Sequence, residues 1–355
     1  MNRFGKNIRL QIFGESHGPY VGITIDGCPA GISLQPDDFE SDLQRRRGGM
    51  IPGTTPRSET DTPFIISGWF NGFTTGTPLT ILFENADTRS QDYEKQKNLP
   101  RPGHADWVSA VKFKGYQDYR GGGHFSGRLT ACLVAGGVIA QKILDRLTIS
   151  GKSIICRSRI VEIGGLPDAE KGIKKAMELG DSVGGIVECS VTGIPPGLGE
   201  PFFDSIESLI SHAVFSIPAI KGIEFGSGFA AARMTGSEHN DALLNAAGQT
   251  STNHAGGISG GISNGNELLY RVAVKPTSST PKAQQTVNME TGNQETLAVK
   301  GRHDLCIALR VPVVLEAVTK LVLADLFLEK RNLMIYKLPV KNREFFIVSI
   351  MLCCY

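Results

Sequence analysis

Two short segments hold the residues best suited to chemistry. Residues 101–106 read Arg-Pro-Gly-His-Ala-Asp, and residues 120–128 place three consecutive glycines between two arginines. Glycines let backbone N–H groups approach an anion closely, and a guanidinium group binds phosphate or carboxylate in a fork. His104 in the first segment can transfer a proton near neutral pH. The pattern predicts an enzyme that handles a multiply charged, phosphorylated compound.

Each of these residues also has an ordinary structural interpretation. His17 lies in a Gly-Glu-Ser-His-Gly turn. A single histidine in a loop more often has no role in catalysis than a catalytic one, and the same holds for His104. The arginine run 45–47 is open to two interpretations, a solvated helix end that complements the helix dipole or a ligand site. For Arg120 and Arg128, which flank the glycines, ligand contact is the favoured interpretation.

A second glycine-rich region spans 253–265 and precedes Lys-Pro-Thr-Ser-Ser at 275–279. It is either a flexible surface loop before a strand or a second loop for an anion or cofactor. Neither glycine region matches G-x-x-x-x-G-K-[ST] or a G-x-G-x-x-G that follows a strand, so nucleoside-triphosphate and Rossmann interpretations are weak.

Mixed strands and helices must position these residues. Apolar patterning predicts strands at 8–13, 21–25, 153–163, 185–191 and 268–274, and helices at 36–47, 126–147, 204–216 and 311–330. We expect Gly48 to cap the first helix and the buried second helix to begin at the glycine-rich loop, where its dipole favours anions. The irregular order of elements predicts an α+β layered fold.

Composition narrows the class of protein. The 355 residues carry a net charge of +2, which gives no overall attraction to nucleic acid or a membrane. Seven cysteines without a C-x-x-C pair indicate a reduced, cytoplasmic setting, and no metal-ligand spacing is present. The start of the chain does not resemble a signal peptide, and the apolar segment 345–355 is too short to span a membrane.

Taken in order, the motifs resemble those of the chorismate synthase family from about residue 3 to about residue 335. The matching segments are 13–18 with 26–29, 45–47, 89–93, 101–106, 118–123, 193–201, 253–257, 275–279 and 301–304. Each is weak alone, but nine in the family's order are very specific. We therefore expect one chorismate synthase-like domain at 1–338 and assign no role to the tail at 339–355.

The resemblance implies a reaction and a fold. Members of the family eliminate phosphate from 5-enolpyruvylshikimate 3-phosphate in a 1,4-anti sense to give chorismate, in aromatic amino-acid biosynthesis. They require reduced FMN without net redox change; some reduce it with NADPH, and others take an external reductant. The implied fold is a β-α-β sandwich with antiparallel sheets at its centre, assembled as a homotetramer.

Residue roles follow from the same resemblance. His17 would protonate the departing phosphate, His104 would donate to the reduced flavin, and Asp304 would assist proton removal through flavin N5. The implied flavin contacts are His124, Phe125, Ser126, Pro218, Ala219, Gly260, Lys275, Pro276, Thr277, Ser278, Ser279 and Arg302.

The charges of the ligands explain the number of basic residues. Substrate and FMN together carry about six negative charges, and arginine is the better geometric match for phosphate and carboxylate. This tally favours ligand contact for the arginine run as well, and Arg46 corresponds to a family arginine associated with NADPH or substrate. The expected ligands of substrate or NADP are Arg45, Arg46, Arg47, Arg101, Arg120 and Arg128.

Two departures from the family keep alternatives open. Many members have Arg-Ser-Ser where this chain has His124-Phe125-Ser126, and a further family arginine aligns near Pro52. One alternative is a flavoprotein oxidoreductase that performs net hydride transfer in the same pocket. The other is a phosphometabolite-binding protein without activity, against which the presence of His17, His104 and Asp304 argues.

Overall fold

The computed structural model describes residues 2–49, 51–57, 59–88, 93, 97–147, 153–299 and 303–337, with side chains in the last helix described to residue 330. Three features of the sequence lie outside the described residues: Arg302, most of the motif at 89–93, and the tail at 339–355.

A five-stranded antiparallel sheet forms the N-terminal half. Its order is β1 (Arg3–Phe4), β2 (Arg9–Gly14), β3 (Tyr20–Asp26), β7 (Leu79–Glu84) and β4 (Phe64–Ser67). Val21, Ile23 and Ile25 alternate along β3 and are completely buried, so one face of this sheet contributes to the core. A short hairpin of β5 (Trp69–Phe70) and β6 (Phe73–Thr74) extends from the sheet.

A four-stranded antiparallel sheet forms the other half. Its order is β10 (Ile220–Phe225), β13 (Leu268–Val274), β9 (Gly185–Thr192) and β8 (Ile155–Ile163). Leu268, Tyr270, Val272 and Val274 are buried at every second position of β13. Two small hairpins, β11 (Ile258–Ser259) with β12 (Ile262–Ser263) and β14 (Gln284–Val287) with β15 (Gln294–Leu297), lie outside this sheet.

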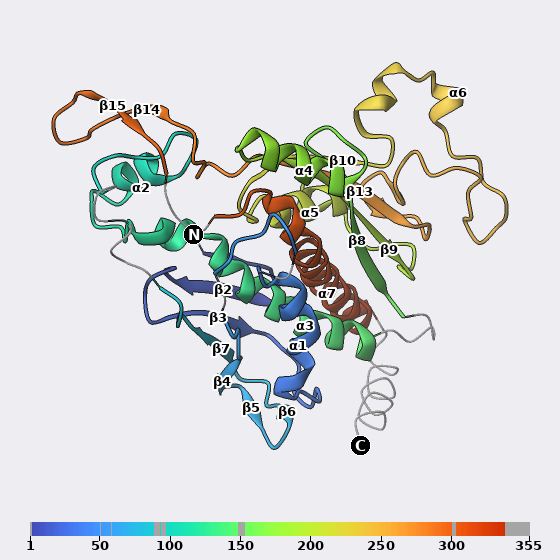
Figure 1. Ribbon diagram of the computed structural model, residues 1–355. Coiled ribbons are helices and arrows are strands. Elements are labelled where there is room, and N and C mark those ends of the chain that lie inside the picture. The colour runs from blue at the N-terminus through green and yellow to red at the C-terminus, as the bar shows by residue number, and fades with distance from the viewer. Residues whose placement is uncertain are drawn as a thin grey trace.

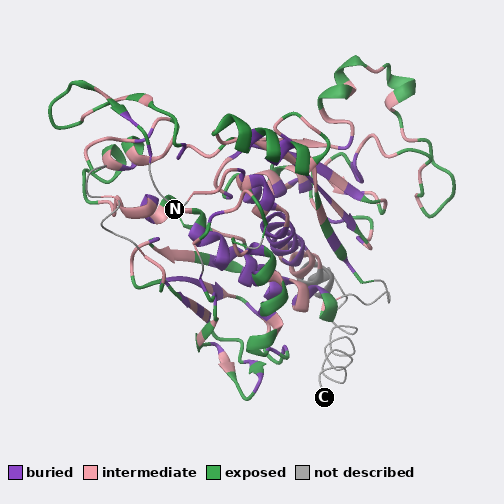
Figure 2. Ribbon diagram, in the orientation of Figure 1, coloured by how far each residue is buried: buried purple, intermediate pink, exposed green. Residues whose placement is uncertain are grey.

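Two long helices pack between the sheets (Figures 1 and 2). α3 (Thr130–Leu147) contacts the first sheet and α7 (Val311–Lys337) contacts the second, while the two helices pack against each other. Residues 130–140 of α3 are all buried, which explains their unbroken run of apolar and small side chains. Shorter helices cover the edges: α1 (Glu40–Arg46), α2 (Asp106–Lys112), α4 (Ala169–Leu179), α5 (Ile206–Val214) and α6 (Gly236–His239).

The expected α+β class with antiparallel sheets is confirmed, and every predicted helix and strand is present. Most ends agree within four residues, whereas the last helix continues to Lys337, seven residues beyond its predicted end. The predicted cap by Gly48 is wrong: the first helix ends at Arg46, and Arg47 is the cap residue with an extended backbone (φ −58°, ψ 145°). The segment 120–147 has the length and hydropathy of a membrane span, but 83% of its apolar window is buried inside the protein, as in a core helix.

Candidate active site

A cavity of about 930 Å³ collects side chains from most of the chain. His17 reaches it from the turn between β2 and β3, His104 from the loop before α2, and Asp304 from the segment before α7. The structure thus brings the three predicted acid–base residues into one cavity. Its apolar wall includes Val311, Val314, Val318 and Leu321 of α7.

His17 lies in a confined part of the cavity, close to Arg57. Burial, and after it the charge of Arg57, lowers the pKa of His17 to about 4. Its ring makes an edge contact with Tyr93 at 5.1 Å between ring centroids. Among the described residues, no hydrogen-bond partner faces its buried Nδ1 atom. The ring is therefore neutral at pH 7 in the absence of an anion.

His104 is held by a charged pair. Its Nδ1 atom lies 2.6 Å from Oδ1 of Asp106, and Arg101 binds the same carboxylate through Nε and Nη2 at 2.7 and 2.8 Å. Burial alone would raise the pKa of Asp106, but the hydrogen bonds from Arg101 and His104 hold it well below its usual range. Because an ionised carboxylate only accepts, Nδ1 carries a proton and Nε2 is left for the cavity.

Asp304 accepts hydrogen bonds from two directions. The backbone N–H of Thr55 donates to its Oδ1 atom at 2.9 Å, and Nη1 of Arg310 lies 3.1 Å from Oδ2. Arg310 also donates from Nε to the carbonyl of Arg46 at 2.8 Å. These contacts fix the position of the carboxylate in the segment before α7.

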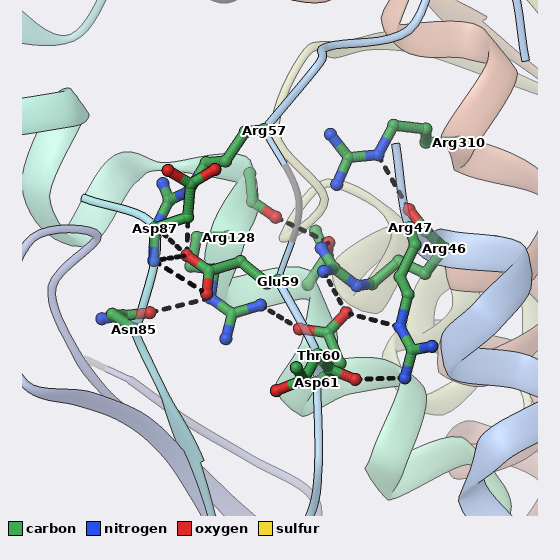
Figure 3. A network of polar contacts seen from close by, with 12 residues as sticks. Arg46, Arg47, Arg57, Glu59, Thr60, Asp61, Asn85, Asp87, Arg128 and Arg310 are labelled. Atoms are coloured by element: carbon green, nitrogen blue, oxygen red, sulfur yellow. Dashed lines mark hydrogen bonds and ion pairs between the residues drawn. The ribbon is translucent and has the colours of Figure 1, made fainter. Parts of the chain in front are cut away.

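A buried carboxylate pairs with one arginine at the end of α1 and one just before α3 (Figure 3). Asp61 is 1% exposed and binds Arg46 through Oδ2 at 2.6 Å and Arg128 through Oδ1. Burial alone would raise the pKa of Asp61, but the charges of Arg46 and Arg128 outweigh it and lower the pKa. Burial lowers the pKa of Arg46 to about 10, so its guanidinium is still cationic at pH 7.

Comparisons with known proteins agree on one family. The chorismate synthase family model matches residues 8–328. A chorismate synthase of Chitinophaga pinensis is 64% identical over 95% of this chain and 100% of its own length, and one of Korarchaeum cryptofilum is 45% identical over 91% and 96%. A crystal structure of a chorismate synthase superposes with a TM-score of 0.68 at 27% identity, covering 92% of this chain and 93% of the other.

The chain belongs to the chorismate synthase family.

The structure divides the six arginines predicted to bind substrate or NADP into four that line the cavity and two that do not. Four of the six, Arg46, Arg47, Arg101 and Arg128, line the cavity. Arg45 and Arg120 are not among its lining residues. Arg45 makes a bidentate ion pair with Glu316 of α7, at 2.7 and 2.8 Å, and Arg120 pairs with Asp118, Nε to Oδ1, at 2.8 Å.

Most of the predicted flavin contacts of the chorismate synthase family line the same cavity. These are His124, Phe125, Ser126, Pro218, Ala219, Lys275, Pro276, Thr277, Ser278 and Ser279. Gly260 is not among the lining residues: it lies in the turn between β11 and β12. Arg302 lies outside the described residues. Ala219 has a positive φ of 75°, which is strained for a residue with a side chain and occurs often at functional sites.

Lys275 joins two halves of the cavity wall. Its Nζ atom donates to the carbonyl of Gly103 at 2.6 Å and to Oγ of Ser278 at 2.7 Å. Oγ of Ser279 accepts from Nη1 of Arg101 at 3.0 Å. Burial, and after it the charge of Lys221, lowers the pKa of Lys275. The ammonium group is thus held beside the loop that carries His104.

Three arginines that line the cavity were missed from the sequence, namely Arg3, Arg57 and Arg310. Arg57 donates to Oγ of Ser16 at 3.0 Å and forms an ion pair with Glu59 at 2.6 Å. It lies five positions after Pro52, near which a further arginine of the family aligns. The Thr-Thr-Pro sequence directly before Arg57 is only a weak indication of a site residue.

Among the described residues, no cluster of histidine, cysteine or carboxylates could hold a metal ion.

Proposed function

We propose that this chain catalyses the elimination of phosphate from 5-enolpyruvylshikimate 3-phosphate to give chorismate, with reduced FMN bound in the same cavity. The family membership makes the chain a chorismate synthase of the shikimate pathway in broad terms. The observation that carries the detailed proposal is that one cavity brings together His17, His104 and Asp304 with four of the predicted arginines.

The cavity fits the two ligands in size and in chemistry. A volume of about 930 Å³ is near the upper end of ordinary small-molecule sites, as two adjacent ligands require. One wall is apolar and suits a flat aromatic ring, while Lys275, the hydroxyls of residues 277–279 and the arginines suit phosphates and carboxylates. Residues 124–126, 218–219 and 275–279 would hold FMN, which in its reduced form supplies an electron-rich ring beside the substrate.

Each acid–base residue has a role that its contacts support. His17 protonates the leaving phosphate once that anion has raised its pKa from about 4. His104 keeps one proton on Nδ1 against Asp106 and presents Nε2 to the ligands. Asp304, held by Thr55 and Arg310, accepts a proton. The arginines neutralise the substrate and orient it.

An anaerobic assay tests the proposal directly. The purified protein is mixed with dithionite-reduced FMN and 5-enolpyruvylshikimate 3-phosphate, and phosphate release and chorismate absorbance are followed together. We expect equal amounts of the two products and no turnover with oxidised FMN. Binding of both ligands without product would favour the inactive binding protein instead.

The reductant and the assembly are separate parts of the proposal. NADPH added in place of dithionite tests whether the chain reduces its own flavin. Consumption of one NADPH per chorismate would identify an oxidoreductase, whereas consumption of only enough NADPH to reduce the flavin agrees with the lyase.

We further propose a cytoplasmic homotetramer. Light scattering of the purified protein tests the assembly, because a monomer would contradict it.

A further inference from the structure

Gly121 and Gly122 lie directly against the two histidines of the cavity. A β-carbon at Gly121 would overlap Cε1 and Nδ1 of the His17 ring. A β-carbon at Gly122 would approach Cε1 of His104 at 3.1 Å and Nε2 at 3.3 Å, closer than most real contacts. The imidazole rings therefore occupy space that side chains at these two positions would need.

The backbone of this segment is built for such an approach. Gly121, Gly122 and Gly123 have φ angles of 58°, 82° and 53°, a region in which residues with a β-carbon are disfavoured. The carbonyl of Gly123 accepts a hydrogen bond from the backbone N–H of Ser16 at 3.1 Å, which ties the segment to the turn that carries His17. From the sequence, these glycines were expected to present N–H groups to an anion; the packing indicates a different use.

We propose that Gly121 and Gly122 are positioning residues whose lack of side chains sets where the rings of His17 and His104 lie. The role in catalysis depends on the proposed function, whereas the effect on the rings does not.

Packing has a larger part in placing His17 than hydrogen bonding has. Its Nδ1 atom has no hydrogen-bond partner among the described residues, and Tyr93 touches the ring only edge-on. A methyl group at position 121 would move this ring rather than the backbone, since a side chain rotates at lower cost. The charged groups that face the ring are Arg57, Glu59, Asp118 and Arg120.

The first experiment compares Gly121→Ala with a matched control. Gly180 ends α4 with the same φ of 58°, but a β-carbon there meets nothing within 4 Å, so Gly180→Ala has the backbone strain without the ring contact. In the anaerobic assay we expect Gly121→Ala to lower kcat at least about tenfold with little change in KM, because a proton donor is displaced. Gly180→Ala should change kcat by less than about twofold.

A double-mutant cycle shows whether the effect passes through the ring. In a His17→Ala background there is no ring to displace, so adding Gly121→Ala should lower kcat no further. An unchanged kcat in Gly121→Ala would overturn the proposal. It would also be overturned if Gly121→Ala lowered kcat by the same factor in the His17→Ala background as in the wild type. Should Gly121→Ala not fold, Gly122→Ala with His104→Ala forms the equivalent cycle on the milder contact.

A second measurement does not need activity. Histidine labelled with ¹³C at Cε1 is titrated by NMR in the intact protein, with His17→Ala to assign the signal. Burial is the first cause of the low pKa of His17, so displacing the ring into the cavity should move its titration midpoint up from about 4 toward 6.5. Gly180→Ala should leave it in place. An unshifted midpoint in Gly121→Ala would refute the positioning role, whether or not the protein makes chorismate. Absence of chorismate formation by the wild type would refute only the proposed function.

Discussion

His17 has the wrong charge for an acid until its ligand arrives. With a pKa of about 4 it is neutral at pH 7, because burial and Arg57 both disfavour the imidazolium. A phosphate dianion beside the ring reverses this balance, since an opposite charge favours the protonated form. The site would thus acquire its catalytic proton together with the substrate, which prevents an unpaired cation from being buried in the empty site.

Proton uptake on binding is the measurable result. Titration of the substrate into the protein at pH 5.5, in two buffers with different ionisation enthalpies, should show more protons taken up by the wild type than by His17→Ala. The comparison with His17→Ala removes the contribution of the substrate phosphate, whose second pKa of about 6 also shifts. Equal uptake in the two proteins would contradict this account of His17.

Asp106 should matter through His104. Asp106→Asn removes the charge that holds the proton on Nδ1, and a hydrogen bond to a charged group is worth about 1.5–3 kcal/mol, so kcat should fall by roughly 10- to 100-fold. The same change in a His104→Ala background should have little further effect on kcat. A full additional loss there would show that Asp106 acts through Arg101 instead.

The sequence predicted the chemical groups of the site better than their partners. His17, His104 and Asp304 stand in recognisable turns, and the structure places all three at one cavity. Arg45 was expected at the ligand, yet it pairs with Glu316, which lies 271 positions away. Such long-range ion pairs leave no local pattern in the chain, and Asp61 was missed for the same reason.

Among the elements, α3 and α7 come into close contact where they pack against each other. A β-carbon at Gly137 would come within 2.5 Å of the Cα atom of Ala317. Glycine at this position lets two helices approach until their backbones nearly touch. This contact positions the apolar face of α7 that lines the cavity.

Gly137→Ala should therefore destabilise the protein. In an exposed helix the change would gain about 1 kcal/mol, but forced overlap in a packed core costs typically 1–3 kcal/mol or more. Gly236→Ala in α6, where a β-carbon meets nothing within 4 Å, is the control and should not lower stability. Urea unfolding of the three proteins checks this, and an unfolding free energy of Gly137→Ala at or above the wild-type value would contradict it.

The existence of these elements was easier to predict than their assembly. Apolar patterning located α3, the strands and the start of α7 within about four residues, because a buried element leaves either a run or an alternation of apolar residues. The failed prediction at Gly48 shows the limit: a glycine after a helix is a common cap, but here Arg47 already leaves the helical conformation while it contacts Thr60 and Glu40.

Across the whole molecule, Asp61 joins α1, the loop after it and the start of α3. Asp61→Asn keeps the shape, and asparagine tolerates the positive φ of 52° at this position. It leaves Arg46 and Arg128 without their shared charge, which should cost about 3–5 kcal/mol of unfolding free energy. Glu40→Gln, which removes an exposed partner of Arg47, should cost less than about 1 kcal/mol. Similar losses in both variants would contradict a special role for Asp61.

Asp61 also determines in which direction the stability of the protein changes with pH. The pKa of Asp61 is lowered in the folded protein, so its contribution to stability is complete above the ordinary value of about 3.9 and is lost as the pH falls below it. Urea midpoints measured from pH 6 to pH 3 should fall less steeply for Asp61→Asn than for the wild type. Parallel curves would show that Asp61 is not responsible.

The position of α7 has a consequence for synthesis on the ribosome. α3 is complete at Leu147 and β8 (Ile155–Ile163) soon after it, but α7, which packs against both, begins only at Val311. At roughly 5–20 residues per second, these elements wait on the order of 10–40 s for α7 to be translated. During that interval the apolar faces meant for α7 have no partner, so the nascent chain should depend on chaperones, and ligands can bind only after the last helix has docked.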